Sequence, residues 1–494
     1  YFYKNYFLEE RLQKCFERLL GRDDAGLNVT LLKKALDEVL GSASYDLHCQ
    51  QLLGVIIGAL SNFSIITGGP GTGKTSVLST LLRVLVRLPG NQWDKIKLVA
   101  PTGKAAQRMT ASLHSSLTDL NSTNAIDERL LQLEASTIHK LLQSPKKVGK
   151  KRLNIQVLII DEVSMVDARL MVELLEALPD DCRIVFLGDK YQLPSVDAGR
   201  VLSDLLPNVD ASYSEGFVQV LSTLVPQEVL EGLAICPSVS PTPLMNRIAM
   251  LTHSFRSVAD IVILSQLINA GEPEKLKSFV ANEAYDLLKD QNVIEGLPLF
   301  DAAEANTRFS GEWFLPQKAA VQFYWPESIE EEFIIAWFEK CYKEGEGSYL
   351  TLLKLAREEL NLALLHQIFN KLEESRVLVF AKSGSHGMHK INQIASQFIR
   401  REIYDFTHED FFHGSSIMIT KNDYSRSLSN GDVGLILFEE GHYRAYFRQN
   451  GEFVVYPVGL LQDFETSFAM TVHKSQGSEY EKVLLLLPEN RESR

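Results

Sequence analysis

The stretch GGPGTGKT, residues Gly68 to Thr75, decides how the rest of the chain is interpreted. It follows Phe63 to Thr67, a short apolar run typical of a buried strand, and precedes Ser76 to Leu88, where apolar residues recur at helical spacing. Glycines let backbone N–H groups surround a phosphate chain, a lysine reaches the β- and γ-phosphates, and a hydroxyl binds Mg²⁺. Strand, loop and helix together predict a P-loop nucleotide site.

Length and composition indicate a multidomain globular protein. The chain has 494 residues, 45% of them hydrophobic, and a net charge of −13. At about 150 residues per domain it should hold two to four domains. No apolar run approaches the roughly 20 residues of a membrane span, so we expect no membrane partner. The acidic balance counts against non-specific coating of nucleic acid but is compatible with a narrow basic track.

Cysteine usage and the first residues bear on the compartment. The five cysteines are scattered and lack CxxC spacing, which predicts a reducing environment rather than zinc or disulfides. No signal peptide is recognisable, so we predict a cytoplasmic protein. Residue 1 is Tyr, and we expect the sequence to begin inside a longer protein.

Further apolar runs predict a parallel sheet. Val157–Ile160 ends in Asp161-Glu162, Ile184–Leu187 ends in Gly188-Asp189, and Lys97–Ala100 ends in Pro101. Such runs without alternation, separated by helical stretches, are typical of strands covered on both faces. Ligands bind at the carboxyl ends of such strands. Ala135 to Leu142 is predicted to close a helical region between them.

Two acidic motifs have the chemistry that ATP hydrolysis needs. Asp161 can hold Mg²⁺, and Glu162 can polarise the attacking water. In the next motif, Gly188 to Pro194, Gln192 could detect the γ-phosphate, or the segment could be a plain turn. Tyr191 could stack on a base, although we favour packing for it.

Regions outside this core have weaker patterns. Residues 1–40 predict two helices, and Arg376–Ala381 and Leu484–Leu487 predict strands. The basic stretch Pro145–Arg152 suggests an exposed hairpin, which could be a solvated charge cluster or a phosphate contact. Ile417–Phe464 alternates in the β manner between Gly-containing turns and predicts a small β-barrel-like insert.

The motifs taken together resemble the RecD family, the α subunits of exodeoxyribonuclease V and members of the superfamily 1 helicases of the 5′→3′ branch. The resemblance spans about Gln51 to Pro488. It rests on segments in the family order: IITGGPGTGKTS (65–76), APTGKAAQRM (100–109), STIHKLL (136–142), IIDEVSMVD (159–167), FLGDKYQLPSVDAG (186–199), LTHSFRS (251–257), NGDVG (430–434) and FAMTVHKSQGSEYEKVLLLLP (468–488).

The resemblance implies an α/β fold of two RecA-like P-loop NTPase domains, parallel sheets with helices on both faces, with a remnant N-terminal helical segment and a small SH3-like β insert. The implied domains are 1–44 (end of a partner-docking helical domain), 45–248 (first motor domain, basic hairpin at about 143–154), 249–412 with 466–494 (second motor domain) and 413–465 (insert).

The resemblance also implies roles for individual residues. Lys74, Asp161, Glu162, Gln192 and an arginine finger, Arg256 from the second motor domain, would be catalytic, with Thr75 and Asp161 on Mg²⁺. The implied ATP contacts are Gln51, Gly69, Pro70, Gly71, Thr72, Gly73, Lys74, Thr75, Ser76, Gly477 and Glu479. The implied lining of the single-stranded DNA channel is Pro101, Thr102, Gly103, Thr137, His139, Lys474 and Ser475. His139 could instead be a core histidine, and Arg256 a surface ion-pair partner.

The implied function is an ATP-driven 5′→3′ DNA helicase subunit that assembles with RecB-like and RecC-like subunits and acts in double-strand-break repair and recombination. No nuclease constellation is seen in the sequence. Family members continue into a Thr-Arg-Ala motif whose arginine contacts the γ-phosphate, and no residue up to Arg494 can be assigned to it. Alternatives are a stand-alone RecD-like helicase or a nucleotide-binding scaffold.

Overall fold

The computed structural model divides into two compact units, Tyr1–Ser257 and Val258–Arg494. It describes residues 3–21, 28–43, 46–90, 92–118, 125–143, 152–194, 199–206, 211–233, 235, 237–238, 242–255, 259–271, 273–276, 331–405, 410–423, 425–449 and 451–488. None of the helices in these ranges is both long and apolar enough to cross a membrane.

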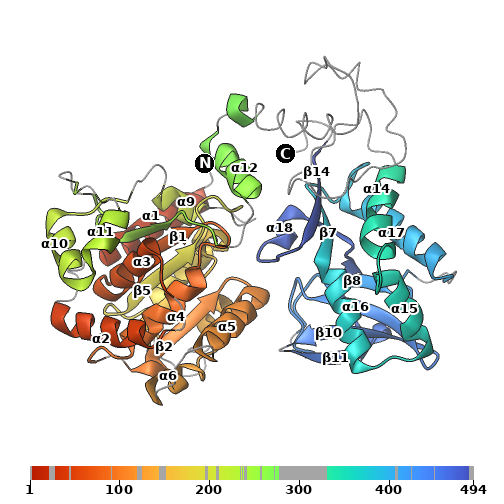
Figure 1. The fold of residues 1–494 in the computed structure, drawn as a ribbon, viewed down its shortest axis with the longest axis horizontal. Helices are drawn as coiled ribbons and strands as arrows, with labels where there is room; N and C mark the ends of the chain where they lie inside the picture. The colour runs from red at the N-terminus through yellow and green to blue at the C-terminus, as the bar shows by residue number, and fades with distance from the viewer. Residues whose placement is uncertain are drawn as a thin grey trace. The chain divides into compact units, whose positions relative to one another are not determined.

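A six-stranded parallel sheet forms the centre of the first unit (Figure 1). The strand order is β3-β2-β4-β5-β1-β6, so the P-loop strand β1 lies between β5 and β6. Because all the strands are parallel, their carboxyl ends meet at one edge of the sheet. The strands are β1 (Phe63–Gly68), β2 (Ile96–Ala100), β3 (Ala135–Thr137), β4 (Val157–Ile160), β5 (Arg183–Gly188) and β6 (Ile248–Leu251).

Helices cover both faces of this sheet because its strands are apolar on both sides. Ile66 and Val185 pack with residues of α2 to α5 and α10, whereas Ile65 and Phe186 pack with α1, α8 and α9. The helices are α1 (Tyr3–Leu20), α2 (Val29–Gly41), α3 (Cys49–Leu60), α4 (Lys74–Leu85), α5 (Gly103–Thr118), α6 (Ala125–Leu130), α7 (Ile138–Gln143), α8 (Ala168–Ala177), α9 (Val201–Leu205), α10 (Glu215–Leu224) and α11 (Gln227–Leu233).

Two features of the first unit differ from the prediction. Ala135–Thr137 is not helical but forms the short edge strand β3, which pairs with β2 before α7 begins. The predicted boundary between residues 248 and 249 cuts through β6, which pairs with β1, and the unit extends to Ser257. A three- or four-residue strand has too few residues to show a period, which explains both differences.

The second unit contains a smaller parallel sheet of order β13-β7-β14. Its helices bury an apolar core that includes Phe338, Phe369 and Phe398. The elements are α12 (Ala259–Ala270), α14 (Glu331–Phe338), α15 (Tyr349–Glu358), α16 (Leu362–Glu374), β7 (Ser375–Val379), α17 (Met388–Glu402), β13 (Ala469–Thr471), α18 (Val472–Ser475) and β14 (Lys482–Leu486). A parallel sheet with helices in each unit confirms the predicted α/β class.

An antiparallel sheet of order β11-β10-β9-β8-β12 interrupts the second unit between α17 and β13. Its strands are β8 (Ser415–Ile419), β9 (Val433–Glu439), β10 (His442–Gln449), β11 (Glu452–Pro457) and β12 (Phe464–Thr466). Glu440 and Gly441 join β9 to β10 with φ of 50° and 83°, the left-handed pair that a two-residue hairpin turn requires. We call this five-stranded sheet the β insert.

A buried histidine ties the helices of the second unit to the β insert. His413 is fully buried; its Nε2–H donates to the carbonyl of Leu353 at 2.9 Å, and its Nδ1 accepts from the Phe438 N–H at 3.0 Å. Both ring nitrogens are therefore used by the neutral imidazole. Burial lowers the pKa of His413 to about 4, against an opposing contribution from the Leu353 hydrogen bond.

We expect a fall from pH 7 to pH 5 to remove about 2 kcal/mol of stability through His413. Its pKa is below the ordinary 6.5, so the unfolded chain binds this proton more tightly than the folded one. The contribution is present above about pH 6.5 and is lost as the pH falls toward 4. Urea unfolding at both pH values measures it.

A second histidine provides the control for this experiment. His413→Gln should shrink the loss of stability between pH 7 and pH 5, whereas His389→Gln, at an exposed position of α17, should leave it unchanged. An equal pH dependence in wild type and His413→Gln would contradict the assignment.

Candidate nucleotide site and strand-end surface

The P-loop connects β1 to α4 in the first unit. Gly71 and Gly73 have φ of 73° and 81°, a left-handed conformation that favours glycine. The Lys74 ammonium donates to the carbonyls of Gly68 at 2.6 Å and Gly69 at 3.1 Å. The loop thus places a lysine and the start of a helix together, an arrangement suited to binding a phosphate chain.

Gln51 joins the start of α3 to this loop. Its Nε2 donates to the carbonyl of Thr72 at 3.0 Å, and its Oε1 accepts from the backbone N–H of His48 at 3.0 Å. A Cβ on Gly73 would lie 2.0 Å from Gln51 Nε2, so a side chain at residue 73 would displace the glutamine. Gln51 is only 5% exposed, and its amide supports the loop; its predicted contact with adenine stays a prediction.

Three carboxyl groups lie at the carboxyl ends of β4 and β5, two neighbouring strands of which β5 also pairs with β1. Asp161 and Glu162 follow β4, and Asp189 follows β5. Burial raises the pKa of all three groups; the negative charge of Asp161 further raises that of Glu162, which reaches about 7, and Lys74 opposes each shift. Because β5 pairs with both β1 and β4, the P-loop and the acidic motifs lie together at the carboxyl end of the sheet.

Glu162 has the features of a residue poised to accept a proton. It adopts a left-handed φ of 52°, which is uncommon for a residue with a side chain. Its Oε2 is buried and has no hydrogen-bond partner among the described residues. Asp161 differs, because its Oδ1 accepts the backbone N–H of Glu162 at 2.9 Å.

Gln192 lies near the acidic site in a turn after β5. The turn is closed by a bond from the Gln192 N–H to the carbonyl of Asp189 at 3.2 Å, and Ser164 Oγ lies 3.5 Å from Gln192 Oε1. The segment after β5 thus contains the turn that the sequence suggested. A role of Gln192 in detecting the γ-phosphate stays a prediction. The favoured interpretation of Tyr191 as a packing residue is wrong, because its side chain is 56% exposed.

An aromatic group beside the P-loop was not predicted from the sequence. The rings of His48 and His253 stack at 5.0 Å, and Phe255 meets the His253 ring edge to face at 4.6 Å. Phe255 is 55% exposed, so the group offers an open aromatic surface on which a base could stack. The motif LTHSFRS contained two of the three rings, but the position of His48 is not a local property of the sequence.

Hydrogen bonds from two backbone N–H groups attach the segment that carries His253 and Phe255 to the P-loop and to α3. The Phe255 N–H donates to the carbonyl of Gly71 at 2.9 Å, and the Thr252 N–H donates to Gln50 Oε1 at 2.8 Å. Residues 252–255 therefore belong to the first unit and not to the second motor domain, where the prediction had placed them. Arg256 lies outside the described residues, so neither its predicted role as an arginine finger nor the ion-pair alternative is tested.

The predicted DNA contacts of the first unit lie at the carboxyl ends of β2 and β3, two neighbouring strands. Thr102 and Thr137 each use their Oγ1 to accept a backbone N–H of the following helix, from Ala105 and Lys140, both at 3.2 Å. His139 is exposed on α7, so the core-histidine alternative is wrong. Pro101 precedes Thr102 in the bend after β2, and Gly103 begins α5.

The basic hairpin lies largely outside the described residues. Arg152, at its end, forms an ion pair with Asp180. That partner favours the charge-cluster alternative for Arg152 and leaves the rest of the stretch untested.

The remaining predicted site residues belong to the second unit. Lys474 and Ser475 lie in α18; Lys474 pairs with Glu465 at 2.9 Å, and Ser475 Oγ donates to the carbonyl of Val472 at 2.8 Å. Gly477 has a left-handed φ of 68° in the turn after α18, and Glu479 is exposed in the segment between that turn and β14.

Several known proteins are similar to this chain. A family model described as "AAA domain" matches residues 51–198, the stretch that contains the P-loop and both acidic motifs. The RecBCD enzyme subunit RecD of Haemophilus influenzae is 30% identical over 464 residues, covering 89% of this chain and 64% of the relative. The RecD subunit of Mycolicibacterium smegmatis is 28% identical, covering 86% and 63%.

Other matches are partial or distant. The ATP-dependent RecD2 DNA helicase of Deinococcus radiodurans is 37% identical over 142 residues, 28% of this chain and 17% of the relative. A Bacteroides Pif1 helicase structure in complex with ADP-AlF3 and single-stranded DNA covers 90% of this chain and 86% of its own, at a TM-score of 0.38 and 13% identity.

The RecD matches cover most of this chain but only part of each relative. This chain spans 64% and 63% of the length of the two RecD subunits compared. The matches run through nearly nine tenths of the chain, which carries the P-loop, Asp161-Glu162 and the LTHSFRS segment described above. The chain is therefore similar to RecD subunits over most of its own length.

Proposed function

We propose that this chain is the ATP-hydrolysing motor of a 5′→3′ DNA helicase, a subunit of a RecBCD-type helicase-nuclease. The observation that carries the proposal is that the P-loop, Asp161, Glu162 and Gln192 lie together at the carboxyl end of one sheet, in a chain similar to RecD subunits. The chemistry of this edge is that of phosphoryl transfer, where positioning and charge stabilisation do most of the work.

The residues at this edge fit a bound Mg²⁺ ion. Asp161 offers a half-buried carboxylate at the end of β4, and Thr75 offers a hydroxyl at the start of α4. Mg²⁺ usually takes one or two protein oxygens and completes its shell with waters and substrate phosphates, so a larger ligand cluster is not needed. When bound, the ion would neutralise charge between the β- and γ-phosphates.

The protein's own residues divide the remaining tasks. Lys74 would bind the β- and γ-phosphates, and Glu162 would accept a proton from the attacking water. Gln192 would respond to the γ-phosphate, and Gln51 with the Phe255 ring would contact the base. Arg256, Gly477 and Glu479 are proposed as further nucleotide contacts.

DNA contacts are proposed in both units. In the first unit they are Pro101, Thr102, Gly103, Thr137 and His139, and in the second Lys474 and Ser475. Grip on the phosphate backbone would make binding nearly independent of sequence and dependent on salt. Translocation requires the two sets to loosen in turn as ATP is hydrolysed.

The biological setting is part of the proposal. The relatives' names place RecD within RecBCD, so we propose RecB-like and RecC-like partners, a cytoplasmic location and a role in double-strand-break repair and recombination. The β insert is proposed as the small SH3-like domain, and residues 1–44 as the end of a partner-docking region.

ATPase activity stimulated by single-stranded DNA tests the motor. Lys74→Gln should lower that activity at least about 100-fold, because it removes the ammonium that stabilises phosphate charge. Lys97→Gln, at an exposed position of β2, should leave the rate within about two-fold and serves as the control. Duplexes with a 5′ or a 3′ overhang then measure polarity.

The result also separates the motor from a scaffold. ATP binding without hydrolysis, measured with the full natural protein and its partner subunits present, would overturn the motor proposal in favour of a nucleotide-binding scaffold.

A further inference from the structure

A short segment of the second unit passes directly from one sheet to the other. Strand β12 pairs with β8 in the β insert, and β13 pairs with β7 in the parallel sheet. Only Ser467 and Phe468 separate the two strands, and α18 with the proposed DNA contact Lys474 follows at once. We call residues 464–475 the crossing segment.

Buried polar groups fix the middle of the crossing segment. Asn392 Nδ2 donates to the carbonyls of Thr466 at 2.8 Å and Ala469 at 2.9 Å, and its Oδ1 accepts the Ala469 N–H at 2.7 Å. The hydroxyls of Ser467 and Ser416 bond at 2.8 Å, and Arg376 donates to the Ser467 carbonyl. The two ends of the segment are therefore held in one arrangement relative to each other.

An ion pair joins the two ends of the crossing segment. Lys474 Nζ lies 2.9 Å from Glu465 Oε1, with side-chain exposures of 23% and 19%. Glu465 stands on β12 opposite Met418, so it belongs to the β insert, whereas Lys474 belongs to the motif after β13. Partial burial reduces screening by salt, so this pair is stronger than a fully exposed one.

We propose that Glu465 competes with DNA phosphate for the Lys474 ammonium and so sets the strength and salt dependence of single-stranded DNA binding. The inference rests on the proposed function. A phosphate that approaches Lys474 must displace the carboxylate or share the ammonium with it, and the two anions repel each other at that distance. Glu465 is part of β12 in the β insert. Binding of a DNA phosphate to Lys474 would therefore break a contact that Lys474 makes with that sheet.

Removing the competing charge should strengthen binding. Glu465→Gln keeps the side-chain shape and should tighten binding of a labelled oligo-dT roughly three- to ten-fold at low salt. The slope of log K against log salt should steepen by up to about 0.7, the value for one more neutralised phosphate on a single strand. Fluorescence anisotropy across a salt series measures both quantities.

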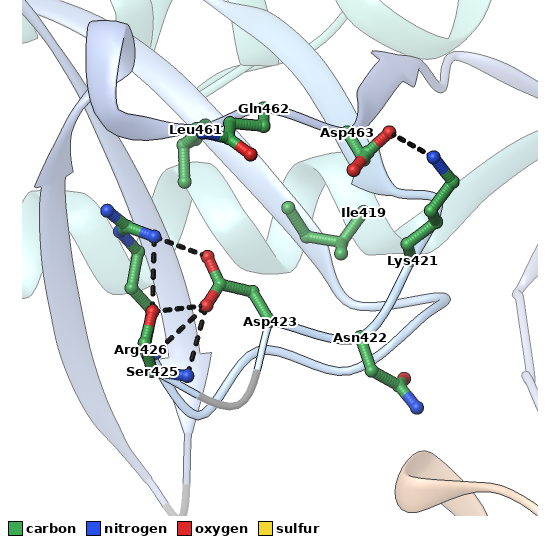
Figure 2. Close-up of a pocket in the computed structure, with 9 residues that line it drawn as sticks. All are labelled: Ile419, Lys421, Asn422, Asp423, Ser425, Arg426, Leu461, Gln462 and Asp463. Atoms are coloured by element: carbon green, nitrogen blue, oxygen red, sulfur yellow. Dashed lines mark hydrogen bonds and ion pairs between the residues drawn. The ribbon is translucent and has the colours of Figure 1, made fainter.

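Two further variants isolate the pair. Lys474→Ala should weaken binding, and Glu465→Gln introduced into Lys474→Ala should add nothing, because the ammonium for which the anions compete is gone. Asp463→Asn removes the same charge two residues away. Figure 2 shows Asp463 paired instead with Lys421. Lys421 Nζ and Asp463 Oδ1 are 2.8 Å apart and both side chains are exposed, so this control should leave binding unchanged.

Each other outcome contradicts the proposal in a distinguishable way. Weaker binding by Glu465→Gln would mean that the carboxylate orients Lys474 for DNA rather than competing with it. An equal gain from Asp463→Asn, or a gain that persists without Lys474, would reduce the effect to overall charge. Absence of DNA binding and of DNA-stimulated hydrolysis in the wild type would overturn the proposed function as well.

Discussion

Replacing Glu162 with Gln is expected to lower ATP hydrolysis by about 10²- to 10⁴-fold while leaving ATP binding nearly unchanged. The substitution keeps the shape of the side chain and removes its ability to take a proton. Phosphate release in the presence of single-stranded DNA measures the first quantity, and titration with a fluorescent ATP analogue measures the second.

The size of the effect follows from the position of Glu162. Its Oε2 is buried without a hydrogen-bond partner in the described part of the chain, so this oxygen stays available to a water. Burial, and then the charge of Asp161, raises its pKa to about 7, which makes it a better base than an ordinary carboxylate. The left-handed φ of 52° indicates that the surrounding structure holds the residue in a costly conformation.

A glutamate in the same unit provides the matched control. Glu173 lies on α8, is half exposed and pairs with Arg169 one helical turn away. Glu173→Gln should change hydrolysis less than about two-fold. If Glu162→Gln retained hydrolysis within a few-fold of wild type, Glu162 would not be the base, and Asp189, the third buried carboxyl of the site, would be tested next.

Local sequence was sufficient to predict most of the core of the first unit. The strands β1, β4 and β5 are mostly apolar runs followed by glycine or acidic residues, so their type could be predicted, and their ends to within one residue. The P-loop could be recognised because its glycines are required by backbone geometry, as the φ values of Gly71 and Gly73 show. Short strands such as β3 carry no such signal.

Contacts between distant parts of the chain were beyond the sequence. His48 and His253 are far apart in the chain, yet their rings stack beside the loop. The use of the Gln51 amide to support the loop depends on how α3 meets β1, which no local pattern encodes. Tyr191 was misjudged because an aromatic residue between a glycine and a proline has the same sequence signature whether it is packed or exposed.

Replacing Asp127 with Ala should destabilise the first unit by about 3–5 kcal/mol, the cost of leaving buried charges without their partner. Asp127 is 2% exposed, and its two oxygens accept bonds from Arg83 and Arg87 of the P-loop helix region at 2.8 to 3.3 Å. Burial alone would raise the pKa of Asp127, but the hydrogen bonds and charges of the arginines outweigh it and lower the pKa. Thermal or urea unfolding measures the loss.

These ion pairs hold the end of α4, the helix that begins at the P-loop. Arg83 lies in the last turn of α4, is 1% exposed, and also donates to Ser42 Oγ at 2.6 Å, so it ties the P-loop helix to the end of α2. Arg87 adds a second link to α2, because its Nε donates to Glu38 Oε1 at 2.9 Å. We therefore expect Asp127→Ala to weaken ATP binding as well as to lower the unfolding temperature.

An exposed aspartate distinguishes this network from an ordinary surface pair. Asp37 pairs with Lys33 one turn away on α2, and Asp37→Asn should cost less than about 1 kcal/mol. Replacing Asp127 by Leu together with Arg83 by Met should restore part of the stability lost in Asp127→Ala, because Asp127 and Arg83 are then removed together while Arg87 keeps its bond to Glu38. If the double variant were no more stable than Asp127→Ala, the loss would not come from the unpaired Arg83, and the ionic explanation would be wrong.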